Sequence, residues 1–371
     1  MTDRIALVGV PCDIEAIRKA QALARDINQD WPNKVALTIG LFCRENWAYT
    51  CFRALVQDDY GVKLGEVEKF DIKKGKIIAY GREGVKAEIP LPDSKVYVRV
   101  GCQVCVDFSA LSADISVGAV GTPADCSTII VRTDKGLKLV EGAIKEGYIA
   151  AKPIEEVKPG TAIIKKIAKE KLDESLAEAR EREASAIQVT HLKTADMDMD
   201  AVKAGAKGKG FKELSYDVID PGLCSVCGNC ATACPEIRIE NERPTLKEGS
   251  TGEGCEAAYL LCPRATLPLK ALERSIFPNG TAHEEGIGRY IKIIAAKARP
   301  EKAPKRQDGG AVTALLAYAL DKGIIDGALT VKAGGEPWKP VPKVSRRSEE
   351  LYETGGTIYS HVTIIPALRG A

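Results

Sequence analysis

Residues 223–235 have the sequence LCSVCGNCATACP, in which four cysteines are separated by two, two and three residues and the last is followed by proline. This spacing places thiolates around a 4Fe–4S cluster. Three come from the tight loop and one from elsewhere, because the fourth cysteine of such a run usually serves a different cluster. A second Cys-Pro pair, Cys262-Pro263, can supply the missing thiolate. The sequence therefore predicts one cluster on four ligands, Cys224, Cys227, Cys230 and Cys262.

The cysteines for a second cluster in this segment are incomplete. A two-cluster ferredoxin would have three more cysteines before Cys262, but only Cys255 occurs in that register, with glycine at 252 and alanine at 258. Cys234 and Cys255 are then left over as a disulfide or as free thiols, and a third cluster at these two residues is not favoured. A zinc site is the alternative for the whole segment, but zinc is usually bound by two separated CxxC pairs.

The composition indicates a soluble intracellular protein. The chain has 371 residues, enough for two or three domains, and 45% of them are hydrophobic. Its 53 basic residues against 51 acidic ones give no charge excess that would suggest nucleic-acid binding. No apolar run approaches the ~20 residues of a membrane span, and residues 1–4 lead into a strand rather than a signal peptide, so we expect a cytoplasmic protein. In that compartment its 12 cysteines favour metal or redox chemistry over disulfides.

The beginning of the chain predicts a strand, a helix and a second strand. The apolar run 4–10 fits a buried strand, segment 13–27 has the apolar spacing of a helix, and 34–42 fits another buried strand. A right-handed crossover of this kind makes the two strands parallel, with both carboxyl ends at one edge of the sheet. Cys12 and Cys43 each directly follow a strand, so both are expected at this edge, where such folds usually have their sites.

Cys102 and Cys105 form a CxxC motif in a predicted loop. Taken alone, this motif is typical of half a zinc site or of a redox pair. Together with Cys12 and Cys43 it completes a set of four thiolates. The sequence therefore predicts a second 4Fe–4S cluster on these four cysteines.

The remaining patterns predict an α/β (α+β) fold: a mixed sheet with flanking helices, plus a small ferredoxin-like iron–sulfur domain. The expected elements are antiparallel strands around the turns at 73–76 and 82–84, strands at 113–120, 127–133, 290–298 and 324–331, and helices at 49–59, 137–146, 161–185 and 311–320. The charged helix at 161–185 is expected to pack through an apolar stripe of Ile163, Ile164, Ile167, Leu172 and Leu176. Residues 190–212 contain few large apolar side chains and are predicted to be a linker. The expected domains are 1–160, 161–213 (charged helix and linker), 214–272 (ferredoxin-like) and 285–371.

Several stretches resemble the beta subunit of coenzyme F420-dependent hydrogenases and formate dehydrogenases of methanogens and related archaea. VGVPCDIEAIRK, GLFCRENWAYT, GCQVCVDF, DISVGAVGTP and IVRTDKG resemble its carboxyl-terminal half, and RQDGGAVTALLAYALDKGIIDGAL and ETGGTIYSHV resemble its amino-terminal half. In that family the halves occur in the opposite order, so we expect a circular permutation with the ferredoxin-like segment as the joint. Because permutation requires neighbouring termini, Met1 and Ala371 are expected to lie near one another.

The resemblance implies a flavin-bearing oxidoreductase subunit that exchanges hydride with coenzyme F420 through FAD and passes single electrons through 4Fe–4S clusters. In the family, a cluster beside FAD is bound by the cysteines that match Cys12, Cys43, Cys102 and Cys105. The implied partners are other subunits of a hydrogenase, a formate dehydrogenase, a heterodisulfide reductase or an F420H2 dehydrogenase. The implied flavin contacts are Gln307, Asp308, Gly309, Gly310, Val312 and Thr313 and, less directly, Gly121, Thr122, Ser127 and Thr357.

We expect FAD to lie between residues 307–313 and the sheet edge that carries Cys12 and Cys43. Glycines precede a helix at 307–313, and a helix amino terminus of this kind can bind phosphate, although the same residues also suit an ordinary helix start. Hydride transfer itself requires no general acid or base. His361 is interpreted as a structural histidine rather than as a residue of the flavin pocket.

Two other functions are compatible with the same residues. One is an electron-relay subunit without a flavin. The other is a flavin reductase of the same superfamily with another acceptor, such as a chlorophyll-type or sulfite-linked reductase. Three basic residues near the predicted sites, Arg44, Lys305 and Arg306, are interpreted as solvated surface charges rather than as ligands of the flavin pyrophosphate or of the acidic coenzyme tail.

Overall fold

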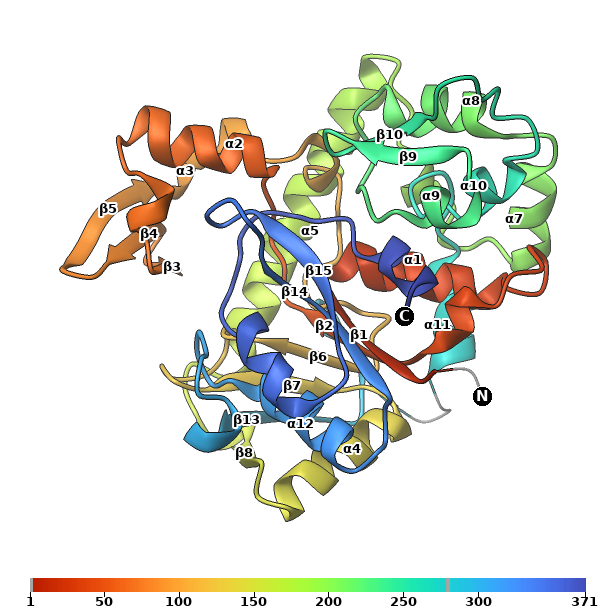
Figure 1. Cartoon of the computed structure of the whole chain (residues 1–371). Coiled ribbons are helices and arrows are strands. Elements are labelled where there is room, and N and C mark those ends of the chain that lie inside the picture. Colours follow the sequence, from red (N-terminus) through yellow and green to blue (C-terminus); the bar gives the residue numbers. More distant parts are fainter. Residues whose placement is uncertain (1–2, 278–280) are drawn as a thin grey trace.

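The computed structural model of the chain describes residues 3–277 and 281–371. Eight strands in these ranges form the central sheet, namely β1 (Ile5–Gly9), β2 (Val35–Leu41), β6 (Ile115–Gly118), β7 (Ser127–Val131), β8 (Ile149–Pro153), β13 (Lys292–Ala298), β14 (Gly327–Ala333) and β15 (Pro340–Ser345). Their order is β15-β14-β1-β2-β6-β7-β13-β8 (Figure 1). Strands β14, β1, β2 and β6 are parallel, and the others run antiparallel to their neighbours. The predicted α/β class with a mixed sheet is confirmed.

Helix α1 (Pro11–Ala22) connects β1 to β2, and these two strands pair in parallel as the sequence predicted. The carboxylate of Asp13 closes the first turn of α1 by accepting a hydrogen bond from the backbone N–H of Val10 at 3.2 Å. Strand β1 also pairs in parallel with β14, so the beginning of the chain and its last hundred residues share one sheet. The predicted proximity of Met1 to Ala371 involves a residue outside the described ranges.

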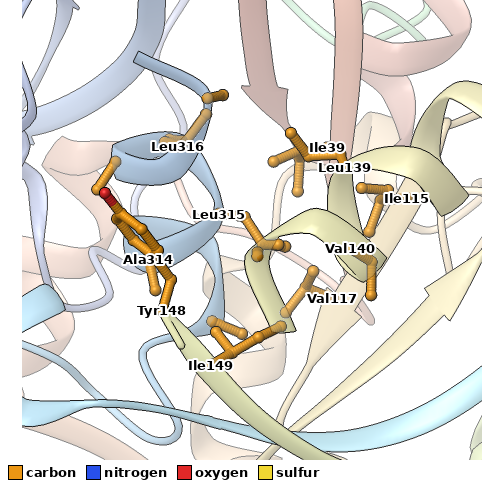
Figure 2. Packing of buried hydrophobic residues seen from close by; sticks show 14 of the residues in the cluster. Ile39, Ile115, Val117, Leu139, Val140, Tyr148, Ile149, Ala314, Leu315 and Leu316 are labelled. Carbon is orange, nitrogen blue, oxygen red and sulfur yellow. The ribbon is translucent and has the colours of Figure 1, made fainter. Parts of the chain in front are cut away.

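Successive residues of the sheet strands face two different hydrophobic clusters, as the alternation of a strand requires. Ile129 and Val131 of β7 pack in the cluster that includes helices α4 (Asp134–Lys145) and α12 (Ala311–Asp321). Ile130, between them, packs with helix α5 (Thr161–Ala184) on the other face. Figure 2 shows the first cluster, in which Val117 of the sheet and Leu315 of α12 are both buried. Helices therefore cover both faces of the sheet.

A small antiparallel sheet projects from one end of the main sheet (Figure 1). Its strands are β3 (Lys69–Lys73), β4 (Lys76–Gly81) and β5 (Gly84–Pro90), flanked by the short helices α2 (Tyr49–Arg53) and α3 (Leu91–Ser94). Phe70 is fully buried, and its ring centroid lies 4.8 Å from that of Trp338, in the β14–β15 connection. The indole N–H of Trp338 donates to the carbonyl of Val67 at 3.0 Å. These contacts attach the predicted antiparallel strands to the main sheet.

The cysteine-rich segment lies beside α1 as a group of short helices with one hairpin (Figure 1). Its elements are α6 (Thr190–Lys193), α7 (Met199–Ala206), α8 (Phe211–Leu214), α9 (Asn229–Ala233), β9 (Ile237–Glu240), β10 (Arg243–Leu246), α10 (Glu256–Leu260) and α11 (Leu269–Ile276). A further hairpin, β11 (Ala282–Glu284) and β12 (Gly288–Tyr290), follows it. None of the helices in the described ranges is long and apolar enough to cross a membrane.

The prediction of a linker at 190–212 is wrong. Helices α6 and α7 occupy this region, and Val202 and Ala206 of α7 are buried. The segment has few large apolar side chains, but Leu192, Ala206 and Phe211 pack in or against the cysteine-rich core. A low content of large apolar residues therefore does not indicate a flexible linker in this segment.

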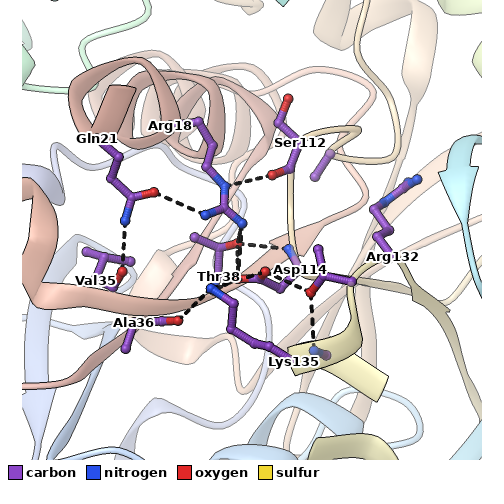
Figure 3. Close-up of polar contacts among 12 residues, drawn as sticks. Arg18, Gln21, Val35, Ala36, Thr38, Ser112, Asp114, Arg132 and Lys135 are labelled. Atoms are coloured by element: carbon purple, nitrogen blue, oxygen red, sulfur yellow. Dashed lines mark hydrogen bonds and ion pairs between the residues drawn. The ribbon is translucent and has the colours of Figure 1, made fainter. Parts of the chain in front are cut away.

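Asp114 lies just before β6 and links it to β2, β7 and α1 (Figure 3). Its carboxylate accepts hydrogen bonds from the backbone N–H of Thr38 at 2.9 Å and from the Thr133 hydroxyl at 2.9 Å, and lies 3.0 Å from the guanidinium of Arg18. Burial raises the pKa of Asp114, but Arg18, Lys135 and the hydrogen bonds outweigh burial, so the pKa lies below its ordinary value. The folded chain therefore contains the ionised carboxylate.

Asp114→Asn is expected to lower the free energy of unfolding by about 3 kcal/mol, because Arg18 would be buried without a charged partner. The folded-state pKa of Asp114 lies below the unfolded value of about 3.9, so its stabilisation is complete above about pH 5 and is lost as the pH falls through the folded-state pKa. Chemical unfolding at several pH values measures both effects, with the exposed Asp58→Asn as the control. Equal stability of wild type and Asp114→Asn at neutral pH would contradict this account.

Candidate metal and cofactor site

Four cysteines from three separate segments meet at the edge of the sheet. Cys12 lies at the start of α1, Cys43 lies two residues after the end of β2, and Cys102 and Cys105 lie in the segment before β6. All four line one small cavity. This arrangement brings together the four thiols that the sequence predicted as ligands of one cluster, and we call them the first cysteine set.

Helix α5 holds the loop that carries Cys102 and Cys105. The ammonium of Lys171 donates to the backbone carbonyls of Cys43 and Asp107, both at 2.6 Å. One turn further along, the hydroxyl of Ser175 donates to the carbonyl of Cys105 at 2.9 Å. Because both donors come from the buried face of one helix, the positions of Cys43 and Cys105 are fixed relative to each other.

The first cysteine set consists of the buried Cys105 and three half-buried cysteines, and it lies among charged groups of both signs. Burial raises the pKa of the Cys12 and Cys43 thiols above their ordinary value. Burial also raises the pKa of Cys105, but Lys171 and Arg264 outweigh it, and the pKa of Cys105 lies below its ordinary value. Thiolates in such surroundings bind soft metal ions, and buried cations suit a centre with net negative charge. The donors and the charges thus fit a 4Fe–4S cluster.

The second cysteine set consists of Cys224, Cys227, Cys230 and Cys262. The loop that carries the first three turns through positive φ values at Val226 (56°) and Gly228 (90°). Burial raises the pKa of the Cys230 thiol well above its ordinary value, and the nearby Cys224, Cys227 and Cys262 raise it further. Four thiols that act on one another in this way suit a metal centre.

Backbone N–H groups point at the sulfurs of the second set. The N–H of Val226 donates to the Cys224 Sγ at 3.3 Å, and those of Arg264 and Ala265 donate to the Cys262 Sγ. Donors of this kind are the usual surroundings of cluster ligands, and they stabilise negative charge on the sulfurs. Cys234 and Cys255, which the sequence left over, form a disulfide with each other. They are not available as ligands in this structure.

A second, much larger cavity of about 490 Å³ lies next to the first cysteine set. It is lined by the ends of β1, β2 and β6, by the start of α12 and by residues 354–364. Seven of the predicted flavin-contact residues line it, namely Gln307, Asp308, Gly310, Val312, Thr313, Ser127 and Thr357. The structure thus gathers residues from the two ends of the chain around one space.

The other three predicted flavin contacts do not line this cavity. A Cβ atom on Gly309 would lie 2.5 Å from the backbone nitrogen of Ser127, so this glycine allows the loop to pack against the sheet. Gly121 has a φ of 101° and packs against Ile164 of α5. The Thr122 hydroxyl is used within its own turn, where it donates to a backbone carbonyl. Their positions give these residues structural roles.

The two cavities share part of their walls. Residues that line both include Val10, Cys43, Arg44 and His361. His361 is buried, and neither of its ring nitrogens has a hydrogen-bond partner within residues 3–277 and 281–371, although Nε2 lies 3.5 Å from a carboxylate oxygen of Asp13. The interpretation of His361 as a satisfied structural histidine is therefore wrong. In the sequence, His361 follows a glycine-rich turn, and this position could have indicated that it lines a cavity.

The basic residues named from the sequence have different surroundings. Arg44 lines both cavities and forms an ion pair with Glu174 of α5 at 2.6 Å. Arg306 lines the large cavity, whereas Lys305 does not. Arg44 is therefore a partly buried, paired residue rather than a solvated surface charge.

Two segments of the chain match the two halves of the same subunit in one protein family. Residues 2–157 match the carboxyl-terminal part of the coenzyme F420 hydrogenase/dehydrogenase beta subunit, and residues 293–369 match its amino-terminal part. The chain belongs to this family. The two parts occur in swapped order, as the sequence analysis predicted, and the cysteine-rich segment lies between them.

Known relatives are similar over part of their length. The coenzyme F420 hydrogenase subunit beta of Methanosarcina barkeri is 41% identical over 180 residues, which are 48% of this chain and 62% of that protein. The coenzyme F420-dependent sulfite reductase of Methanocaldococcus jannaschii is 38% identical over 39% of this chain and 24% of its own length. A chain in the solved F420-reducing [NiFe] hydrogenase complex from Methanosarcina barkeri is 42% identical, with a TM-score of 0.47, over 49% of this chain and 62% of that one. The chain thus spans less than two thirds of the length of each of these relatives.

Cys43→Ser is expected to remove one of two clusters. After anaerobic reconstitution, wild type should bind about eight iron atoms per chain and Cys43→Ser about four, because the second cysteine set is separate. Iron and sulfide analysis measures this difference. Cys126→Ser is the matched control, since Cys126 is also a half-buried free cysteine but lines neither cavity. An unchanged iron content in Cys43→Ser would exclude the first cysteine set as a cluster site.

Proposed function

We propose that the protein is a subunit that exchanges hydride with coenzyme F420 through FAD and passes single electrons through two 4Fe–4S clusters. FAD would occupy the large cavity, and the clusters would be held by the first and second cysteine sets. The acceptor or donor would be another subunit, in a hydrogenase, a formate dehydrogenase, a heterodisulfide reductase or an F420H2 dehydrogenase. Family membership and the F420-linked relatives support this proposal.

The observation that carries the proposal is the shared wall between the large cavity and the first cysteine set. When bound, FAD supplies the conversion between two-electron hydride chemistry and one-electron transfer. A one-electron centre is then needed immediately beside it. Cys43 lines both cavities, so a cluster on the first set would lie against a flavin in the larger one.

The start of α12 supplies a place for the flavin phosphates. Gly310 precedes the helix with a φ of 68°, and the helix is 11 residues long, so its free N–H groups and dipole face the cavity from this end. Arg306, four residues earlier, lines the same cavity and can offset the charge of a pyrophosphate. The sheet edge opposite provides the apolar wall that a flavin ring requires, through Val8, Leu41 and Val117.

The loop that carries the second cysteine set lies next to the loop that carries Cys102 and Cys105. A Cβ atom on Gly101 would lie only 2.9 Å from the carbonyl oxygens of Leu223 and Cys224. Ser225, beside Cys224, lines the cavity of the first set. The two loops that carry cluster ligands are therefore in contact, and this supports electron transfer from one cluster to the other.

Binding and turnover test the proposal directly. The anaerobically reconstituted protein should bind FAD and catalyse the reduction of a viologen dye by reduced coenzyme F420. Loss of both clusters should leave flavin binding but abolish dye reduction if the dye accepts electrons from the second cluster. A protein that binds both clusters but no flavin would instead be an electron relay.

Gly310→Ala is expected to weaken FAD binding about tenfold, a change of about 1.4 kcal/mol. The added Cβ would lie 2.9 Å from the Ala303 Cβ and 3.0 Å from the Arg306 Cδ, and the φ of 68° disfavours any residue but glycine. Fluorescence titration with FAD measures the affinity, and the iron content should stay constant. Gly335→Ala is the control, because Gly335 has nothing within 4 Å of an added Cβ. Equal affinities in wild type and Gly310→Ala would show that FAD does not use this helix start.

A flavin reductase with another acceptor is the second candidate. The observation that favours it is the similarity to the coenzyme F420-dependent sulfite reductase of Methanocaldococcus jannaschii. Reduced coenzyme F420 would still be the electron donor, but the acceptor would be a small molecule rather than a partner subunit. Sulfite-dependent oxidation of reduced coenzyme F420 by the isolated protein would support this candidate.

A further inference from the structure

Arg264 touches a ligand of each cysteine set. It follows Cys262-Pro263 in the chain, and its backbone N–H donates to the Cys262 Sγ of the second set. Its side chain extends into the cavity of the first set, where the guanidinium donates a hydrogen bond to the Cys105 thiol. The residue is 3% exposed. One residue and its two hydrogen bonds thus connect the two cysteine sets.

The groups around the guanidinium of Arg264 make it a fixed positive charge. Nη1 lies 2.8 Å from the Nε2 of His191. Because a guanidinium can only donate, Nε2 accepts and the ring proton is on Nδ1, so His191 is neutral. Burial, and then Arg264, lower the pKa of His191 well below its ordinary value. Burial lowers the pKa of Arg264, but the acidic groups of Cys105, Glu15 and Cys12 outweigh burial, and the pKa lies above its ordinary value.

Arg264 still has an unused donor. Its Nε is buried and has no hydrogen-bond partner among the described residues. A buried, unpaired donor of a charged group is costly, so an acceptor in the adjoining cavity would be favourable. A cluster bound by the first cysteine set would bring its sulfurs and its negative charge into this cavity.

We propose that Arg264 is the positioning residue for electron transfer between the two clusters. It holds Cys105 against the loop of Cys262, and its charge raises the reduction potential of the first cluster by stabilising the reduced form. With a cluster on each set, one electron would pass between the two clusters, and no bond would form or break. This inference rests on the proposed function, because it requires a cluster on each set.

Redox titration followed by EPR tests the proposal on the anaerobically reconstituted full chain. In Arg264→Gln, the ratio of reduced to oxidised first cluster at a fixed potential should fall by at least about tenfold, which is about 59 mV for a one-electron couple. The second cluster should shift less, because its bond from the backbone N–H of residue 264 is retained. Arg18→Gln is the matched control, since Arg18 is also buried but is paired with Asp114, away from both sets.

The outcomes separate this inference from the proposed function. If wild type binds both clusters and Arg264→Gln titrates like wild type, Arg264 does not tune the first cluster and the inference is overturned. If wild type binds no cluster on the first set, both the inference and the proposed function fail. If Arg264→Gln cannot be loaded, Arg264→Met decides. Methionine is uncharged and has no N–H donors, so a fall in the ratio of reduced to oxidised first cluster supports the inference and an unchanged ratio overturns it.

Discussion

Buried polar contacts of helix α1 hold the cysteine-rich segment on the main sheet, and the arrangement of both cysteine sets depends on them. Lys19 of α1 is fully buried, and its ammonium donates to the carbonyl of Cys262 and to the carbonyl and hydroxyl of Thr266, each at 2.7 Å. Asn229 of α9 donates from its side-chain amide to the carbonyls of Ala16 and Leu261 at 2.8 and 3.0 Å. All three protons of the ammonium are used, which offsets its removal from water.

Helix α1 therefore sets the distance between the two sites. Its first turn carries Cys12 of the first set, and two turns later Lys19 contacts the backbone of Cys262 in the second. Burial lowers the pKa of Lys19 to about 7, and Cys262 and Cys227 oppose this change. A negatively charged centre on the second set would favour the protonated form further, so metal binding and the contact of Lys19 support each other.

The strand ends and cysteine spacings could be interpreted from the sequence because their causes are local. Cys12 and Cys43 follow strands that a single crossover helix joins, and this connection allows one common handedness. Cys224, Cys227 and Cys230 of the second set were identified from their spacing, and Cys262 from its Cys-Pro pair. In contrast, Lys169 and Lys171 differ by two positions in a charged helix, and no local pattern shows that the first is exposed and the second buried.

Helix α5 shows why the rest could not be predicted. Hydrophobic spacing selected a stripe that includes Leu172 and Leu176, but both are only half-buried. Ile164 of the predicted stripe is buried, but the rest of the face that packs is made of small and polar residues, namely Ala168, Lys171, Ser175, Ala179 and Arg182. Its partners are backbone carbonyls of a cysteine loop that lies about seventy residues earlier in the chain. Which face of the helix is buried therefore depends on that loop, and the sequence of the helix alone does not show it. The unpaired ring nitrogens of His361 and the hydrogen bond from Arg264 to Cys105 could not be predicted for the same reason, because both depend on residues that are distant in the sequence.

The swapped order of the two family halves is compatible with one site because the site depends on strand pairing and not on chain order. Strand β14 of the second half pairs with β1 of the first, and α12 before it faces the same sheet edge as Cys12 and Cys43. The segment between the halves leaves the sheet after α5 and returns at β13, which pairs with β7 and β8. Its path passes α1, and the contacts of Lys19 and Asn229 fix it there. Inserting the second cysteine set at this joint therefore places it beside the first set without disturbing the cavity on the other side.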